Sequence, residues 1–210
     1  MKHIVLLGDS VFDNASYVKG GPDVIRQLQT KLPDGWRATL CAVDGSMVHD
    51  VKSQMSKLPP DTTHLVVSAG GNNALDNVNI LSEKAQSAAD VLLRLAEVAD
   101  GFRAQYREML DHVMSRRLPA AVCTVYYPQL PDPMLQKLAV TALAIFNDVI
   151  ISEAFMAGVP LLDLRLICDH PSDYANEIEP SVLGGEKITE AILKLIAEHD
   201  FTKRRTEVFR

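Results

Sequence analysis

The 210-residue chain is long enough for one domain with a sizeable hydrophobic core, and no composition shift or linker suggests a second domain. Its formal net charge is -6 and its 21 basic residues are interspersed with acidic ones, which argues against a nucleic-acid partner. The 3 cysteines lack metal-type spacing and the first apolar run is too short for an export signal, so we expect a cytoplasmic protein.

Five short runs have the length and composition of β-strands. Each is mostly apolar rather than alternating, which is typical of parallel strands covered on both faces. They are His3–Gly8, Arg37–Val43, His64–Ala69, Ala120–Tyr127 and Val159–Leu164. Helical patterns alternate with these runs, so the sequence predicts a three-layer α/β/α sandwich with a five-stranded parallel sheet joined by right-handed crossovers.

The helical patterns are delimited by proline and glycine. Two crossover helices are expected at Asp23–Leu32, which follows a proline, and at Met47–Leu58, which ends at two prolines. The interval from Ile80 to Arg117 contains two helical patterns separated by Gly101. The last helix carries an apolar stripe from Ile188 to Ile196 that would lie against the sheet.

The pattern from Met134 to Met156 is apolar on nearly every face, so this helix is either largely buried or paired with a second subunit in a homodimer. The longest apolar region, Leu138–Leu162, is interrupted by polar residues and does not read as a membrane span. We place a single domain at residues 1–200 and expect a basic, solvated tail at residues 201–210.

Polar residues and glycines follow three of the predicted strands. They are Gly8, Asp9 and Ser10 after the first strand, Asp44, Gly45 and Ser46 after the second, and Gly70, Gly71, Asn72 and Asn73 after the third. The carboxyl ends of parallel strands form the usual ligand crevice of such a sheet. A serine hydroxyl there, opposite amide donors, has the layout of a nucleophile facing an oxyanion hole.

The ordered set of these motifs resembles the SGNH/GDSL hydrolase superfamily, whose members are esterases, lipases, thioesterases and carbohydrate deacetylases. "LLGDSVFDN", "VDGSMV" and "SAGGNNAL" are similar to its first three sequence blocks, and the resemblance extends from His3 to about Ile196. It implies the flavodoxin-like SGNH-hydrolase fold and a small-molecule ester or acylated substrate. It also implies Ser10 as the nucleophile, and an oxyanion hole formed by the N–H groups of Ser10 and Gly45 with the Asn72 amide.

The fourth block of the family contains Asp-x-x-His, and here the matching stretch is "NEIEPSVLGGEKITEAI". Asn176 stands at the position of the aspartate and Glu179 at that of the histidine. A glutamate is a poor base unless burial raises its pKa. Three alternatives follow: Glu179 is the base; His170 from the preceding loop is the base, oriented by Asp163, Asp169 or Asp173; or the chain is a non-catalytic ligand-binding protein that has lost the histidine.

Three further residues are predicted to face the substrate. Asp9 and Asn73 adjoin the predicted catalytic residues Ser10 and Asn72, and Asn73 replaces a carboxylate of the family pattern. Tyr127 follows the fourth strand, where it would line an acyl pocket or pack in the core. The six histidines have no spacing typical of a metal site, and we expect neither a metal nor a cofactor.

Overall fold

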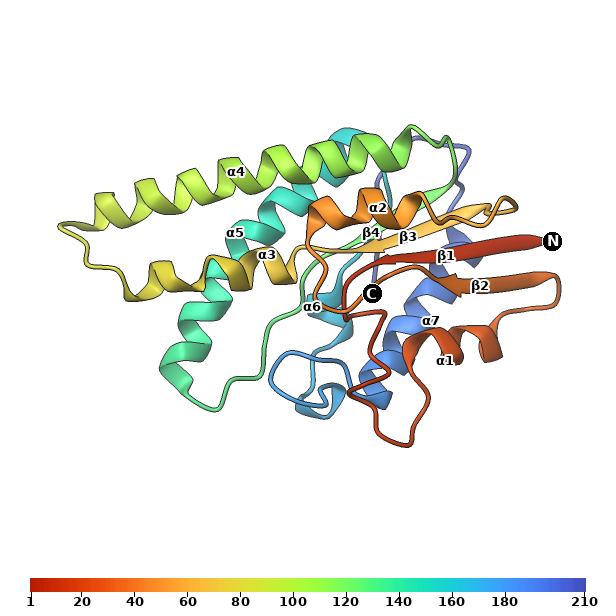
Figure 1. The fold of residues 1–210 in the computed structure, drawn as a ribbon, viewed down its shortest axis with the longest axis horizontal. Coiled ribbons are helices and arrows are strands. Elements are labelled where there is room, and N and C mark those ends of the chain that lie inside the picture. The colour runs from red at the N-terminus through yellow and green to blue at the C-terminus, as the bar shows by residue number, and fades with distance from the viewer.

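The computed structural model describes residues 1–210 and contains one sheet of six parallel strands in the order β2-β1-β3-β4-β5-β6 (Figure 1). The strands are β1 (Lys2–Gly8), β2 (Trp36–Leu40), β3 (His64–Ser68), β4 (Ala120–Cys123), β5 (Leu161–Leu162) and β6 (Val208–Phe209). The α-helices are α1 (Val24–Lys31), α2 (Val51–Met55), α3 (Gly71–Asp76), α4 (Ala88–Met114), α5 (Pro133–Ala157), α6 (Leu164–Ile167) and α7 (Val182–Glu198). Three short 3-10 helices are η1 (Val48–Asp50), η2 (Val78–Ser82) and η3 (Pro171–Asp173).

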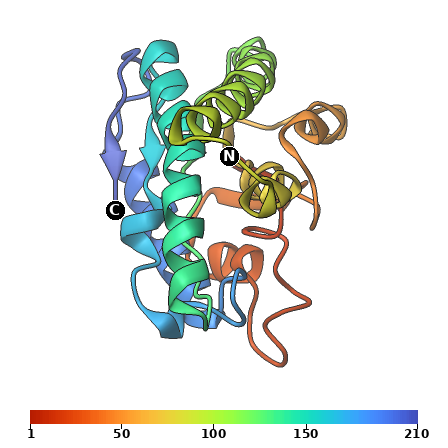
Figure 2. The same cartoon turned by 90° about the vertical axis from the view of Figure 1, so that its left-hand side faces the viewer.

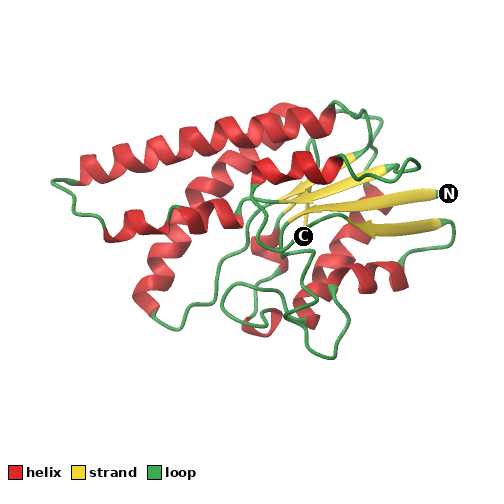
Figure 3. Ribbon diagram, in the orientation of Figure 1, coloured by secondary structure: helices red, strands yellow, loops and turns green.

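Helices cover both faces of the sheet, which confirms the predicted three-layer sandwich (Figures 2 and 3). Successive side chains of a strand point to opposite faces, and in β1 they enter two separate cores. Ile4 and Leu6 pack with residues of α1 and α7, whereas Val5 and Leu7 pack with residues of α2, α4 and α5. A strand that is buried on both faces needs this continuous apolar sequence.

The sheet has six strands rather than the predicted five because residues 201–210 return to its edge. The Leu161 N–H donates to the Glu207 carbonyl and the Asp163 N–H donates to the Phe209 carbonyl, both at 2.9 Å. Phe209 is buried in the core between the sheet, α1 and α7. The prediction of a solvated tail is therefore wrong for β6, where backbone pairing and burial of one aromatic ring outweigh the surrounding charges.

Two helix predictions are also corrected. Gly101 does not divide the segment before Arg117, since α4 is continuous from Ala88 to Met114. An exposed glycine inside a helix costs only about 1 kcal/mol, which long helical flanks of this kind offset. The segment predicted as one helix at Met47–Leu58 consists of η1 followed by the short α2.

The apolar helix α5 has two different halves. Its C-terminal half packs in the core, where the buried Glu153 accepts hydrogen bonds from Arg107 of α4. No residue of its N-terminal half, 133–145, is buried, and this half extends with α4 beyond the sheet (Figure 1). The helix α5 is long enough to cross a membrane, and its most apolar window has a mean hydropathy of 1.7. Core helices of soluble proteins share both properties.

Candidate active site

Ser10 lies just beyond the carboxyl end of β1, where the chain turns away from the sheet. The Asp9 N–H donates to the Ser68 carbonyl at 3.0 Å, so the first turn residue still lies against β3. Gly8 has a φ of +121°, and a Cβ atom there would lie 1.7 Å from the Ser68 oxygen. Only glycine allows this approach, which places the buried Ser10 side chain at the edge of the sheet.

The Ser10 hydroxyl donates a hydrogen bond to Glu179 Oε1 at 3.1 Å. Glu179 is buried, and its second oxygen, Oε2, is enclosed without a hydrogen-bond partner. Burial raises the pKa of Glu179 to about 7, and the hydrogen bond from Ser10 opposes only part of this rise. The structure thus brings together the predicted nucleophile and one of the two predicted bases.

A tight loop before α7 positions Glu179. Asn176 Oδ1 accepts hydrogen bonds from the backbone N–H groups of Ile178 and Glu179, both at 2.9 Å, and the Ala175 N–H donates to the Glu179 carbonyl at 2.8 Å. An asparagine side chain commonly closes a turn in this way. Asn176, which stands where the family has an aspartate, therefore holds the backbone of the residue that replaces the histidine.

Asn14 joins the first motif to the fourth. Its Nδ2 donates to the Pro180 carbonyl at 3.1 Å, and its Oδ1 accepts from the Val24 N–H at 3.0 Å. Both ends of this buried amide are paired with backbone groups that are distant in sequence. The contact fixes the residue next to Glu179 relative to the turn that carries Ser10.

Asn72 lies in the first turn of α3, directly after β3, and its Nδ2 donates to the Ser46 carbonyl at 2.9 Å. This bond links α3 to the loop that contains Gly45. A carboxamide nitrogen has two donors, so the second Asn72 N–H is available to a ligand. The loop ends that carry Ser10, Gly45 and Asn72 therefore meet at one edge of the sheet.

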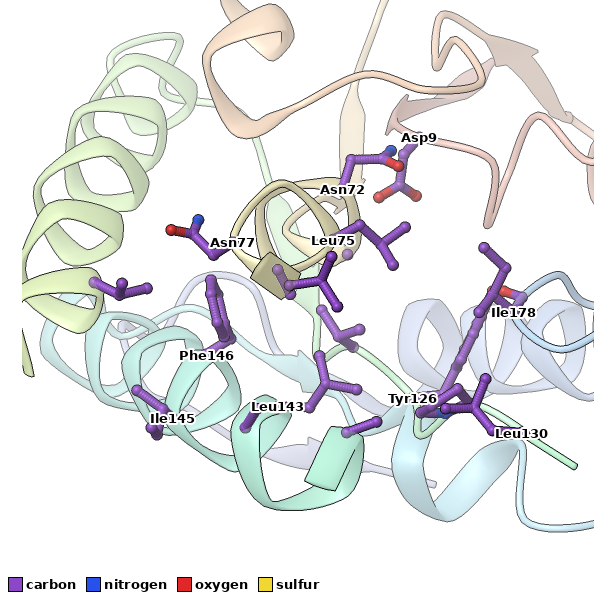
Figure 4. Close-up of a pocket in the computed structure, with 18 of the residues that line it drawn as sticks. Asp9, Asn72, Leu75, Asn77, Tyr126, Leu130, Leu143, Ile145, Phe146 and Ile178 are labelled. Carbon is purple, nitrogen blue, oxygen red and sulfur yellow. The ribbon is translucent and has the colours of Figure 1, made fainter. Parts of the chain in front are cut away.

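Ser10, Asn72 and Glu179 border a cavity of about 250 Å³, whereas Gly45 does not line it (Figure 4). Asp9, Ser10, Asn72 and Glu179 form its polar end, and the remaining wall is mostly apolar. Asp9 Oδ1 accepts a hydrogen bond from the Val11 N–H at 3.2 Å. Burial, with a smaller contribution from the negative charge of Glu179, raises the pKa of Asp9 to about 7. The site thus contains two carboxyl groups whose ionisation falls near neutral pH.

The structure does not place His170 at this cavity. Its side chain is exposed, and Nδ1 lies 2.8 Å from the Ser172 hydroxyl at the start of η3. None of the three suggested orienting carboxylates contacts its ring: Asp163 pairs with Arg165, while Asp169 and Asp173 pair with Lys187. The local turn directs the His170 ring to solvent, so this geometry favours Glu179 over His170 as the base.

Asn73 and Tyr127 also lie away from the cavity. Asn73 Oδ1 accepts from the Val48 N–H at 3.0 Å, and its Nδ2 donates to Gln105 at 3.2 Å. Consecutive helical residues point in different directions, and here Asn72 alone borders the cavity. Tyr126, rather than Tyr127, lines the cavity and donates through its hydroxyl to the Ile178 carbonyl at 2.6 Å.

One polar residue of the site was not identified from the sequence. Gln54 of α2 is buried and forms hydrogen bonds with the backbone of Gly8 and with the Ser46 hydroxyl. The available signal was a polar residue within the stripe Val51, Met55 and Leu58, which otherwise faces the core. A buried amide at such a position needs partners, and backbone groups at the strand end provide them.

The chain is similar to known hydrolases in sequence and in fold. Residues 6–184 match the model of the GDSL-like lipase/acylhydrolase family, whereas no significantly similar sequence is found among curated proteins. Similar solved structures include an extracellular lipase from Streptomyces rimosus, with a TM-score of 0.64 and 20% identity over 89% of this chain and 96% of that chain. An acetyl xylan esterase has a TM-score of 0.66 and 14% identity over 92% of this chain and 99% of that chain.

Phospholipase A1 from Streptomyces albidoflavus NA297 has a TM-score of 0.61 and 18% identity over 94% of this chain and 99% of that chain. At these identities the structural similarity establishes the fold alone. The family match covers most of the chain and agrees with the resemblance of the sequence motifs. The protein therefore belongs to the GDSL-like lipase/acylhydrolase family.

Proposed function

We propose that the protein is a serine hydrolase of carboxylic esters or acyl groups, with Ser10 as the nucleophile and Glu179 as the general base. The observation that carries this proposal is the hydrogen bond from Ser10 Oγ to Glu179 Oε1 at the polar end of the cavity. A nucleophile within hydrogen-bond reach of a base is the arrangement that activates a serine.

The raised pKa of Glu179 supports the choice of base. A general base works best when its pKa lies near the working pH, because it is then both deprotonated and basic. Burial brings the pKa of Glu179 to about 7, close to that of an ordinary imidazole. A desolvated glutamate can therefore take the proton that a histidine takes in other members of the family.

The reaction follows from the positions of these groups. Ser10 Oγ attacks the carbonyl carbon while its proton moves to Glu179, and the backbone N–H groups of Ser10 and Gly45 with the Asn72 amide bind the oxyanion. The tetrahedral intermediate then expels the alcohol, which receives the proton from Glu179. Water attacks the resulting acyl-enzyme as Glu179 accepts its proton. The second tetrahedral intermediate expels the Ser10 oxygen, which takes the proton back from Glu179, and the carboxylic acid leaves.

Labelling with a fluorophosphonate probe tests this proposal. We expect stoichiometric labelling of the wild type, none in Ser10→Ala, and labelling at least about 100-fold slower in Glu179→Gln. Glu177→Gln is the matched control, since Glu177 is an exposed carboxylate in the same loop. Labelling of the control and of His170→Ala should equal that of the wild type.

The alternative is a ligand-binding protein of the same fold that lost its catalysis together with the histidine. Loss of one member of a catalytic set lowers the rate by several orders of magnitude, so such decay is physically reasonable. Absence of Ser10 labelling across the range from pH 6 to pH 9, in protein shown to be folded, would favour this alternative and reject the hydrolase.

A further inference from the structure

The cavity beside Ser10 is built by the parts of the molecule that extend past the sheet. Leu75 of α3 and Val78 of η2 form one wall, Leu95 and Val98 of α4 another, and Leu143 and Phe146 of α5 the third. Figure 4 shows Asn72 and Asp9 on one side of this space and Leu143 and Phe146 on the other. The proposed catalytic groups therefore occupy one side of a mostly apolar compartment.

The wall away from Ser10 is mostly apolar. The only charged residues that border the cavity are Asp9 and Glu179, and both lie at the Ser10 end. No lysine or arginine lines it. A phosphate would find no cation here, and beyond the Ser10 end the hydroxyl groups of a sugar would lose most of their hydrogen bonds to water, because few polar side chains such as Asn77 line that part of the wall. A hydrocarbon chain would gain free energy by leaving water.

We infer that this compartment binds the acyl chain of the substrate, and that the substrate is an ester of a linear, medium-length fatty acid rather than an acetyl ester. The inference rests on the proposed function and specifies its substrate. The leaving alcohol must receive its proton from Glu179, so it lies on the side of that carboxylate, at the polar end of the cavity. The acyl group then lies on the other side, toward α3, α4 and α5.

Two small side chains on α5 make room for the chain. Ala139 and Ala142 both line the cavity, and their spacing of three residues places them on one face of the helix. A larger residue at either position would fill space that a hydrocarbon chain occupies. Ala144 of the same helix is exposed and does not border the cavity, which makes it a matched control.

Hydrolysis of p-nitrophenyl esters, from acetate through butyrate, hexanoate and octanoate to palmitate, tests the inference. In the wild type kcat/KM should rise by about tenfold for each two carbons added until the compartment is full. In Ala142→Phe the ratio of octanoate to acetate kcat/KM should fall at least tenfold. Ala144→Phe should retain the wild-type ratio, and the milder Ala139→Leu gives a second measurement if Ala142→Phe does not fold.

Different results separate this inference from the proposed function. If the fluorophosphonate labels Ser10 but p-nitrophenyl acetate is the best substrate of the series, the inference is overturned and the proposed hydrolase function stands. A series of alkyl acetates whose kcat/KM follows the alcohol chain would overturn the assignment of the compartment to the acyl group. If Ser10 is inert, calorimetry with the uncharged octanamide decides: binding weakened at least tenfold by Ala142→Phe supports a hydrocarbon site, and no binding to the wild type rejects it.

Discussion

The Gln54 side chain forms hydrogen bonds with both the N–H and the carbonyl of Gly8. The Gly8 N–H donates to Gln54 Oε1 at 2.7 Å, and Gln54 Nε2 donates to the Gly8 carbonyl at 2.8 Å and to the Ser46 hydroxyl at 3.2 Å. One side chain of α2 therefore joins the end of β1, just before Ser10, to the loop that carries Gly45. This contact fixes two of the three segments that supply the proposed oxyanion donors.

Replacing Gln54 with leucine should reduce both stability and reactivity. The substitution removes the acceptor of a buried backbone N–H, which costs about 1–3 kcal/mol, and urea denaturation should measure a loss of free energy of unfolding in this range. Fluorophosphonate labelling of Ser10 should slow in the fraction that remains folded. Gln29→Leu is the control, since the exposed Gln29 amide bonds a single carbonyl, that of Ala38; equal effects of both substitutions would contradict a special role of Gln54.

Asn72→Ala should lower the turnover number of ester hydrolysis by about 100- to 1000-fold, the usual effect of removing one oxyanion donor. KM should change much less, because the oxyanion forms only in the transition state. Steady-state kinetics with a p-nitrophenyl ester measures both values. Asn79→Ala, at an exposed asparagine of η2, is the control. A loss of less than about threefold in Asn72→Ala would remove this residue from the oxyanion hole.

The pH dependence of hydrolysis should identify the base. Glu179 acts in its ionised form, so kcat/KM should rise with pH and level off above the pKa of about 7. The same midpoint is expected in His170→Ala, because the His170 ring of the wild type faces solvent. Asp9 also has a pKa raised to about 7, and Asp9→Asn removes its contribution to the pH profile, so that the remaining midpoint reports Glu179. A midpoint near the ordinary glutamate value in Asp9→Asn would mean that Glu179 is not desolvated in the working enzyme.

Residue types at strand ends were enough to predict which polar groups lie together at the cavity. Parallel strands bring their carboxyl ends to one edge of the sheet. Ser10, Asn72 and the segment of Glu179 therefore meet there, and this does not depend on the lengths or bounds of the helices. The error at Tyr127 arose because β4 ends at Cys123. The Asn147 amide bonds both the N–H and the carbonyl of Val125 at 2.8 Å, and this side-chain pairing replaces a further strand pairing.

The cavity was not predictable because it depends on how far two helices extend. The continuity of α4 through Gly101 and the projection of α5 residues 133–145 create its walls, and neither follows from hydrophobic periodicity alone. The role of Gln54 was missed for a related reason. Its backbone partners are dozens of positions distant in the sequence, and only tertiary structure brings them into hydrogen-bond range.

Asp9 makes the native fold sensitive to pH. Its pKa is about 7 in the folded protein, mainly through burial, and near 4 when the chain is unfolded. Between these values the folded state binds more protons than the unfolded state. The free energy of unfolding therefore falls as pH rises from about 4 to 7, and the full cost of the buried charge is present above pH 7.

Asp9→Asn should for this reason stabilise the protein at high pH and not at low pH. The asparagine Oδ1 can still accept the Val11 N–H, and the amide carries no charge to desolvate. We expect the variant to exceed the wild type by about 2–4 kcal/mol at pH 8 and to match it near pH 4, measured by urea denaturation at each pH. Asp34→Asn, at an exposed turn, should follow the wild type at every pH. A constant difference between Asp9→Asn and the wild type would mean that the Asp9 carboxyl does not titrate in this window.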